Sequence, residues 1–177
     1  MQDRKNNFEI FIKDDFFNNV FYEKILNNLN TAIWSPNLNK LRQETKHLWL
    51  ASSLNDLDIK NYIFEKIKNY FYKEVISVKL INYTLVSKLQ NPIPHNDFGE
   101  NVNYQLLIYL KGDEKLNNGI GFYIKKENEF ILNTHIGFKE NRAIFFKAGI
   151  THSPLTWQED CSKRFSIICQ LLVKDLK

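Results

Sequence analysis

His95 and Asp97 stand two residues apart in the segment Pro94-His95-Asn96-Asp97. In an extended segment, residues i and i+2 share a face, so this imidazole and this carboxylate can point to a common centre. One neutral imidazole and one carboxylate make part of a site for a divalent metal of intermediate softness. His152 comes after several expected strands, and a second imidazole from a distant strand would complete the set. The pattern predicts a metal site formed by His95, Asp97 and His152.

Two histidines and one carboxylate on one face of a metal leave other coordination positions open, which is the arrangement associated with non-haem Fe(II) oxygenases. The alternative is that these residues are ordinary hydrogen-bonded polar side chains of a β protein.

A second feature, the pair Arg164 and Ser166, bears on the choice between a metal site and ordinary polar residues. Arg164 and Ser166 share a face at the start of an apolar strand, so a guanidinium and a hydroxyl can bind one carboxylate together. An arginine that opens a buried strand needs an anionic partner, because an unpaired buried charge is very costly.

Two stretches before residue 74 have the spacing of helices, and the first is expected to be capped by Asp14 or Asp15. Their apolar residues step by four: Phe17, Phe21, Ile25 and Leu29 in the first, and Ile59, Ile63, Ile67 and Phe71 in the second. Lysines on the other side of the second stretch and just after it are expected to form a solvated face: Lys60, Lys66, Lys68 and Lys73.

Short strands separated by turn residues dominate the chain after residue 74, and one further strand is expected at Phe8–Ile12. The expected strands are Glu74–Tyr83, Tyr104–Leu110, Ile120–Ile124, Glu129–Leu132, Ala143–Phe146 and Arg164–Val173. Close spacing of short strands favours an antiparallel sandwich or barrel over a parallel doubly wound sheet. The sequence therefore predicts a mainly β protein with N-terminal helices.

The length of 177 residues is that of a single domain, with residues 1–74 as helical support and 75–173 as the β core. The net charge of +4 is too dilute for a nucleic-acid partner, and no apolar run approaches the roughly 20 residues that span a bilayer. Because the N-terminus is polar, no secretory signal is expected, and Cys161 and Cys169 are expected to be free thiols. These features favour a cytoplasmic location.

The order of these motifs resembles that of the 2-oxoglutarate- and Fe(II)-dependent dioxygenases, most of all the prolyl-4-hydroxylase-like branch. The resemblance covers about residues 75–173 and, more faintly, the segment Phe11–Phe17. The matching pieces, in order, are His95-x-Asp97, Tyr109-Leu110, Gly119-Ile120-Gly121-Phe122, Asn141–Phe146, His152 and Arg164-x-Ser166. The resemblance implies a double-stranded β-helix, or jelly roll, which agrees with the mainly β interpretation.

Roles for individual residues follow from the resemblance. His95, Asp97 and His152 resemble the Fe(II) ligands. Four further residues resemble those of the 2-oxoglutarate pocket: Arg164 and Ser166 at its distal carboxylate, Tyr109 at the same carboxylate, and Tyr83 in the pocket lining. Tyr83 and Tyr109 could equally be core aromatics. The implied reaction consumes 2-oxoglutarate and O2, releases succinate and CO2, and hydroxylates an aliphatic C–H of a small molecule or a peptidyl side chain. In halogenating relatives a small residue replaces the carboxylate ligand, so Asp97 favours hydroxylation or another oxygenation.

The chain departs from the family pattern at two points. It has Gly119-Ile120-Gly121 where two adjacent glycines are common, and a slightly longer loop between His152 and Arg164 that carries Trp157. Trp157 and Trp49 are expected to pack, although both could border a substrate opening. His135 and His47 are expected in solvated loops.

Two other functions stay open. A cupin-like jelly-roll metal protein could use the same metal without 2-oxoglutarate, but it would give Arg164-x-Ser166 no role. A non-catalytic binding module on a degenerate scaffold would be expected to lose a metal ligand, and this chain keeps all three. The sequence does not identify the substrate or the oligomeric state.

Overall fold

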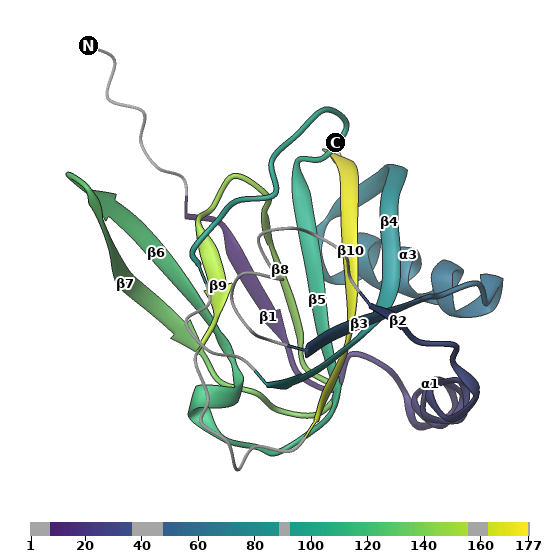
Figure 1. The fold of residues 1–177 in the computed structure, drawn as a ribbon. Helices are drawn as coiled ribbons and strands as arrows, with labels where there is room; N and C mark the ends of the chain where they lie inside the picture. Colours follow the sequence, from purple (N-terminus) through teal and green to yellow (C-terminus); the bar gives the residue numbers. More distant parts are fainter. Residues whose placement is uncertain (1–7, 37–47, 89–92, 156–162, 177) are drawn as a thin grey trace.

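The structure is a computed structural model that describes residues 8–36, 48–88, 93–155 and 163–176. In this part of the chain, seven strands form an antiparallel sheet, which stands at the centre of Figure 1. In spatial order they are β1 (Ile10–Lys13), β8 (Ala143–Lys147), β5 (Tyr104–Lys111), β10 (Arg164–Asp175), β4 (Lys73–Lys88), β3 (Leu48–Ser53) and β2 (Ser35–Pro36). This is the large sheet.

A second, small sheet lies to one side of the large sheet, at the left of Figure 1. In spatial order its strands are β7 (Glu129–Ile136), β6 (Ile120–Lys126) and β9 (His152–Pro154). The 3-10 helix η1 (Leu116–Asn118) leads into β6. At Gly119 an added Cβ would lie 2.0 Å from the carbonyl oxygen of Ile136, so only glycine fits where β6 begins against the end of β7.

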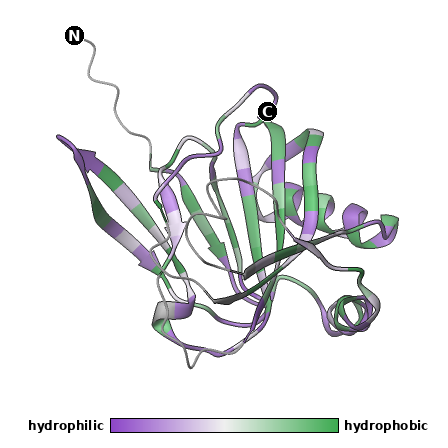
Figure 2. Ribbon diagram, in the orientation of Figure 1, coloured by the Kyte–Doolittle hydropathy of each residue, from purple (hydrophilic) through white to green (hydrophobic). Residues whose placement is uncertain are grey.

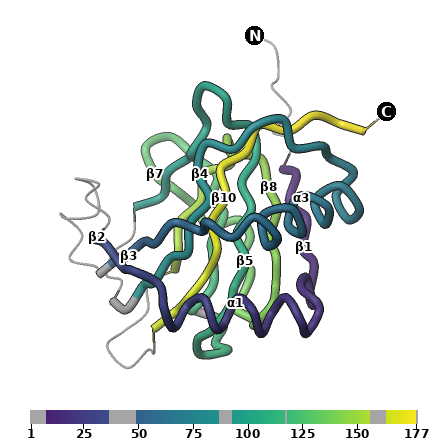
Figure 3. Tube along the Cα trace, turned by 90° about the vertical axis from the view of Figure 1, so that its right-hand side faces the viewer, coloured from purple at the N-terminus to yellow at the C-terminus, as the bar shows by residue number. Residues whose placement is uncertain are grey.

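Two helices cover the other face of the large sheet, as Figure 3 shows: α1 (Asn19–Thr31) and α3 (Leu57–Phe71). The apolar stripe of α3 is buried against the sheet, and Asp56 caps the helix by accepting hydrogen bonds from the main-chain nitrogens of Asp58 and Ile59. The helix ends at Tyr72, whose left-handed backbone (φ 55°, ψ 38°) turns the chain into β4. Among the described residues no helix is long and apolar enough to cross a membrane.

The large sheet is apolar on both faces because it lies between the helices and the small sheet. In β5, every residue from Tyr104 to Leu110 is buried. Leu106 and Ile108 belong to the helix-side core, whereas Leu107 and Tyr109 belong to the core between the sheets. Figure 2 shows the same distribution, with apolar residues along the central strands and polar residues at the tip of the β6–β7 hairpin. The predicted mainly β fold with N-terminal helices is confirmed.

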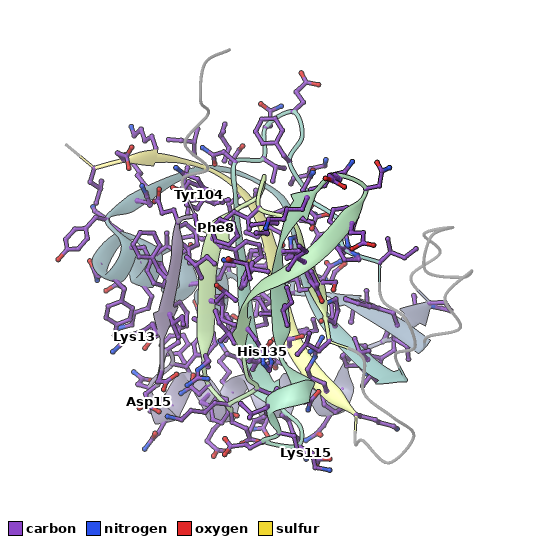
Figure 4. The ribbon with its side chains drawn as sticks, turned by 90° about the vertical axis from the view of Figure 1, so that its left-hand side faces the viewer. Phe8, Lys13, Asp15, Tyr104, Lys115 and His135 are labelled. Atoms are coloured by element: carbon purple, nitrogen blue, oxygen red, sulfur yellow. The ribbon has the colours of Figure 1, made fainter. Side chains whose placement is uncertain are left out.

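Three local expectations are wrong. The cap of α1 is Asn18, whose side chain accepts a hydrogen bond from the main-chain nitrogen of Phe21 at 3.0 Å, and not Asp14 or Asp15. Asp15 adopts a left-handed backbone (φ 52°), and Asp14 instead binds Arg142. His135, expected in a turn, lies inside β7, as Figure 4 shows. Lys73 is not solvated either: its side chain is 11% exposed and pairs with Glu9 at 3.2 Å, because β4 carries it into the sheet. The strands β2, β3 and β9 were not expected.

The ion pair between Asp14 and Arg142 ties the turn after β1 to the turn before β8. Arg142 donates to Asp14 through Nε at 2.6 Å and Nη2 at 3.0 Å, and Lys139 Nζ lies 3.0 Å from the same carboxylate. The hydrogen bonds from Arg142 outweigh the effect of burial and, with Lys139, lower the pKa of Asp14 to about 2. A carboxyl group whose pKa is lowered on folding stabilises the fold above its ordinary pKa, and this stabilisation is lost as the pH falls through the folded value.

We expect Asp14→Asn to lower the free energy of unfolding by about 1 kcal/mol at pH 7, the upper end for a partly exposed pair. The difference from the parent should shrink as the pH falls from about 4 toward 2, because Asp14 is then protonated in both states. Urea unfolding across this pH range measures it. Glu74→Gln, which removes the exposed pair with Lys174, serves as the control and should have a much smaller effect. A pH-independent difference would show that the ion pair is not the cause.

Candidate metal centre and anion site

The main chain brings His95 and His152 side by side. The two residues exchange main-chain hydrogen bonds, from His95 N to His152 O at 3.0 Å and from His152 N to His95 O at 2.8 Å. His152 is the first residue of β9, so this bridge places the segment around His95 along the edge of the small sheet. The main-chain nitrogen of Asp97 donates to the carbonyl of Ala148 at 3.0 Å, which fixes the same segment two residues further on.

Main-chain carbonyls fix the orientation of both imidazole rings. The Nδ1 atom of His95 lies 2.9 Å from the carbonyl oxygen of Ile93, and that of His152 lies 2.9 Å from the carbonyl oxygen of Ile150. A carbonyl accepts a hydrogen bond, so both Nδ1 atoms carry the proton and both Nε2 atoms are left as ligands. The Nε2 atoms lie 3.9 Å (His95) and 3.4 Å (His152) from the same oxygen, Oδ2 of Asp97.

The donor set of His95, Asp97 and His152 fits a divalent metal. One ligand atom from each residue lies within 4.8 Å of the others. Among the described residues, these three form the cluster of His, Cys, Asp or Glu side chains that could hold a metal ion. Burial raises the pKa of Asp97, but the neighbouring rings of His152 and His95 and the hydrogen bond from Gln105 outweigh it and bring that pKa to about 2. Asp97 is therefore ionised and ready to bind a cation. Side-chain exposure rises from 7% at His152 to 39% at His95, so the site opens to solvent on the His95 side.

Arg164, at the start of β10, forms the other end of the site. Its side chain is buried, and Nη1 donates to the carbonyl oxygens of Asn118 at 2.9 Å and Gly119 at 3.1 Å. Its guanidinium carbon lies 5.5 Å from the centre of the Tyr109 ring. Burial lowers the pKa of Arg164, yet a guanidinium keeps its proton at any ordinary pH. The residue therefore holds a positive charge inside the protein, where a carboxylate would interact with it strongly.

Ser166 is buried two residues after Arg164 on β10, and its side chain has a partner that the sequence did not identify. The Oγ atom of Ser166 lies 2.8 Å from Oγ1 of Thr84, directly across the pair of β10 and β4. Thr84 is buried and lines the same cavity as Arg164. The sequence offered a signal for Thr84, since a hydroxyl next to Tyr83 on an expected strand must lie on the opposite face from Tyr83.

Tyr109 and Tyr83 were both predicted to border the cosubstrate pocket, and the structure separates them. Tyr109 faces the interior between the sheets, beside Arg164, and its hydroxyl has no hydrogen-bond partner among the described residues. Burial raises the pKa of Tyr109 to about 12, so the phenol is a donor at neutral pH. Tyr83 belongs to the helix-side core on the other face of β4, so its assignment to the pocket is corrected to Thr84. The expected position was one residue out of register, and each such step reverses the face of a strand.

We expect Tyr109→Phe to leave the free energy of unfolding unchanged or to raise it by up to about 1 kcal/mol, because it removes a buried hydroxyl without a described partner. If Tyr109 donates to a bound dicarboxylate, the same substitution should weaken 2-oxoglutarate binding about 10-fold, the value of one hydrogen bond to a charged group. Tyr83→Phe is the control and should leave that affinity unchanged. Equal affinities for all three proteins would remove Tyr109 from the site.

One cavity connects the metal centre to Arg164. Besides the three candidate ligands and Arg164, its walls are apolar or carry neutral polar groups. They are formed by Trp49, Ala51, Leu80, Asn82, Thr84, Gln105, Leu107, Ile120, Phe146, Pro154, Ile168 and Gln170. Trp49, for which packing was expected, is one of the buried residues that line the cavity.

The other residues of interest are placed as follows. Cys169 is buried in the helix-side core, where burial raises its pKa, so the thiol is unreactive in the folded protein. Lys66 lies over the rings of Tyr62 and Tyr70 on α3. Trp157, His47 and Cys161 lie outside the described residues.

Comparisons with known proteins show which fold the chain shares. No family model matches the chain, and no curated protein matches it by sequence. Solved structures do match. A prolyl hydroxylase of Trichoplax adhaerens, in complex with a peptide of the hypoxia inducible factor oxygen degradation domain, has a TM-score of 0.62 at 11% identity, covering 94% of this chain and 84% of that one.

Two bacterial proteins are similar to the same extent. An oxidoreductase of the 2OG-Fe(II) oxygenase family from Burkholderia pseudomallei has a TM-score of 0.63 at 9% identity, over 92% of this chain and 84% of that one. HygX of Streptomyces hygroscopicus, with nickel, 2-oxoglutarate and hygromycin B bound, has a TM-score of 0.60 at 9% identity, over 92% and 83%. The chain therefore has the jelly-roll fold of these oxygenases, which confirms the fold that the resemblance implied.

Proposed function

We propose that this protein is a 2-oxoglutarate- and Fe(II)-dependent oxygenase that hydroxylates an aliphatic C–H bond of a small molecule or a peptidyl side chain. The observation that carries the proposal is that His95, Asp97 and His152 converge in the same cavity as the buried Arg164. In the overall reaction, substrate R–H, O2 and 2-oxoglutarate give R–OH, succinate and CO2. A cavity that pairs a metal centre with a buried cation suits a cosubstrate that has a keto acid at one end and a carboxylate at the other.

Each described residue has a defined task in this proposal. His95, Asp97 and His152 would hold Fe(II), and the metal, when bound, supplies the activation of O2 that is coupled to decarboxylation of 2-oxoglutarate. Arg164 would pair with the distal carboxylate of 2-oxoglutarate. The hydroxyls of Ser166, Thr84 and Tyr109 would surround that carboxylate as donors.

The protein also controls water and protons. The main-chain carbonyls of Ile93 and Ile150 accept from Nδ1, so in the neutral rings of His95 and His152 the free nitrogen is Nε2, the atom that would bind the metal. Apolar side chains around the cavity, among them Leu107 and Phe146, keep water from the reacting atoms.

The two substrate classes have support in the structural neighbours. The Trichoplax adhaerens prolyl hydroxylase holds a peptide, and HygX holds the small molecule hygromycin B. A shared fold does not transfer a substrate, so proline is not assigned as the target.

An anaerobic titration of the purified protein with Fe(II) and then 2-oxoglutarate tests the proposal. We expect one equivalent of Fe(II) to bind, and a weak visible charge-transfer band to grow and saturate at one equivalent of 2-oxoglutarate. Binding of iron without the band would contradict the role of Arg164 and favour a jelly-roll metal protein that works without 2-oxoglutarate. No binding of iron would refute the metal centre itself.

A further inference from the structure

We infer that Gln105 is a positioning residue for the metal centre: from the large sheet, it holds the Asp97 carboxylate in the orientation that faces the two imidazoles. The inference rests on the proposed function only in taking His95, Asp97 and His152 as the metal ligands. It assigns to Gln105 a role that the sequence motifs do not contain.

The contact is made at the ligand atom. Nε2 of Gln105 donates a hydrogen bond to Oδ2 of Asp97, the same oxygen that lies 3.4 Å from Nε2 of His152 and 3.9 Å from Nε2 of His95. A hydrogen bond from a neutral amide to a carboxylate is stronger than one between neutral groups. Gln105 therefore acts on the oxygen that faces the metal centre, and it opposes rotation of the carboxylate away from that centre.

The three candidate ligands differ in what orients them. The rings of His95 and His152 are fixed by carbonyl groups two residues earlier in the chain, at Ile93 and Ile150. Both rings are held by main-chain carbonyls close in the sequence, so these contacts depend on the local backbone conformation and not on another side chain. Among the described residues, the contact that fixes the Asp97 side chain from outside the triad is the side chain of Gln105. The carboxylate is thus the ligand whose orientation depends on one particular side chain.

Gln105 is itself well fixed. It lies in β5 near the centre of the large sheet, paired with Phe146 of β8 on one side and Gln170 of β10 on the other. Its side chain is 4% exposed in a strand whose neighbouring residues are apolar. A buried carboxamide is costly unless it is hydrogen-bonded, so its presence here is explained by the bond to Asp97.

The test is a titration of the metal-free protein with Co2+, whose visible absorption reports coordination geometry, on the parent, Gln105→Met and Gln170→Met. Methionine matches the length of glutamine but donates no hydrogen bond. We expect Gln105→Met to weaken Co2+ binding 10- to 100-fold, roughly the effect of losing an outer-shell contact, and to change the visible spectrum. Gln170 is the cross-strand neighbour of Gln105 on β10 and lines the same cavity, but it makes no hydrogen bond to Asp97 among the described residues. Gln170→Met should therefore keep the parent's Co2+ affinity and spectrum.

The outcomes separate this inference from the proposed function. If the parent binds Co2+ and Gln105→Met binds it with the same affinity and spectrum, Gln105 has no positioning role and the metal centre stands. If the parent binds no Co2+, the metal centre and with it the proposed function fail. Circular dichroism establishes that each variant is folded. If Gln105→Met is not folded, Gln105→Asn takes its place, because asparagine keeps the amide but is one methylene too short to reach Asp97. The same loss of Co2+ affinity is then expected.

Discussion

Asp97→Ala is expected to lower the affinity for Fe(II) by about 10³-fold or more and to reduce 2-oxoglutarate consumption to background. The loss of an outer-shell partner typically weakens metal binding 10- to 100-fold, and the loss of a ligand must cost more. Asp97 is also the anionic member of the group, since its pKa of about 2 keeps it charged at neutral pH. Equilibrium dialysis with Fe(II) under anaerobic conditions and an assay of succinate measure the two effects.

Asp58→Ala is the matched control, because this carboxylate lies on α3, pairs with Lys24 and is 76% exposed. Its removal should change neither Fe(II) binding nor succinate formation. Consumption of 2-oxoglutarate by Asp97→Ala at the rate of the parent would exclude Asp97 from the metal centre.

Replacing Arg164 has the second largest expected effect, and it should separate cosubstrate binding from metal binding. Arg164→Met keeps the aliphatic volume but removes the charge, so the affinity for 2-oxoglutarate should fall about 100-fold, the value of hydrogen bonds between charged groups. Arg164→Lys should give an intermediate loss, because the ammonium keeps the charge without the planar fork of donors. Fe(II) binding should stay at the level of the parent in both variants.

The structural cost of these variants can be measured separately. Arg164 also donates to the carbonyls of Asn118 and Gly119, so Arg164→Met should lower the free energy of unfolding by about 1–3 kcal/mol. Urea unfolding gives this value, and the affinity is then compared under conditions where every variant is folded. A 2-oxoglutarate affinity equal to that of the parent would show that Arg164 has only its structural role at those carbonyls.

The sequence predicted the parts of the site that short-range periodicity controls. His95-x-Asp97 and Arg164-x-Ser166 each depend on two residues sharing a face of one extended segment. The structure brings His95 and Asp97 together, and it pairs Ser166 with Thr84, which lines the same cavity as Arg164. The helix α3 was predictable for the same reason, because four buried residues at a spacing of four define its face.

The remaining parts depend on which strands become neighbours. Alternation places Thr84 on the face opposite Tyr83, but its pairing with Ser166 could be assigned only once β4 was known to lie against β10 in this register. In the sequence, Gln105 is only a polar residue within an apolar strand. Its contact with Asp97 depends on the fold, which brings the two side chains together. β9 is three residues long and is defined by its pairing with β6, so no periodicity marks it. Asp14 was misassigned as a cap because its partner, Arg142, is distant in the sequence.

The two halves of the site belong to different sheets: His95 and His152 to the small sheet or its edge, and Arg164, Ser166 and Thr84 to the large one. A molecule held at both ends would therefore act as a noncovalent cross-link between two layers that otherwise meet through apolar packing and a few hydrogen bonds, such as those of Gln105 and Arg164. Its binding free energy is added to the work of separating the layers. Slow opening of the two sheets, visible as hydrogen exchange at β6 and β9, would then be suppressed in proportion to ligand occupancy. The protein would be most rigid when both ends of the site are occupied, and its amides would exchange fastest with solvent when the site is empty.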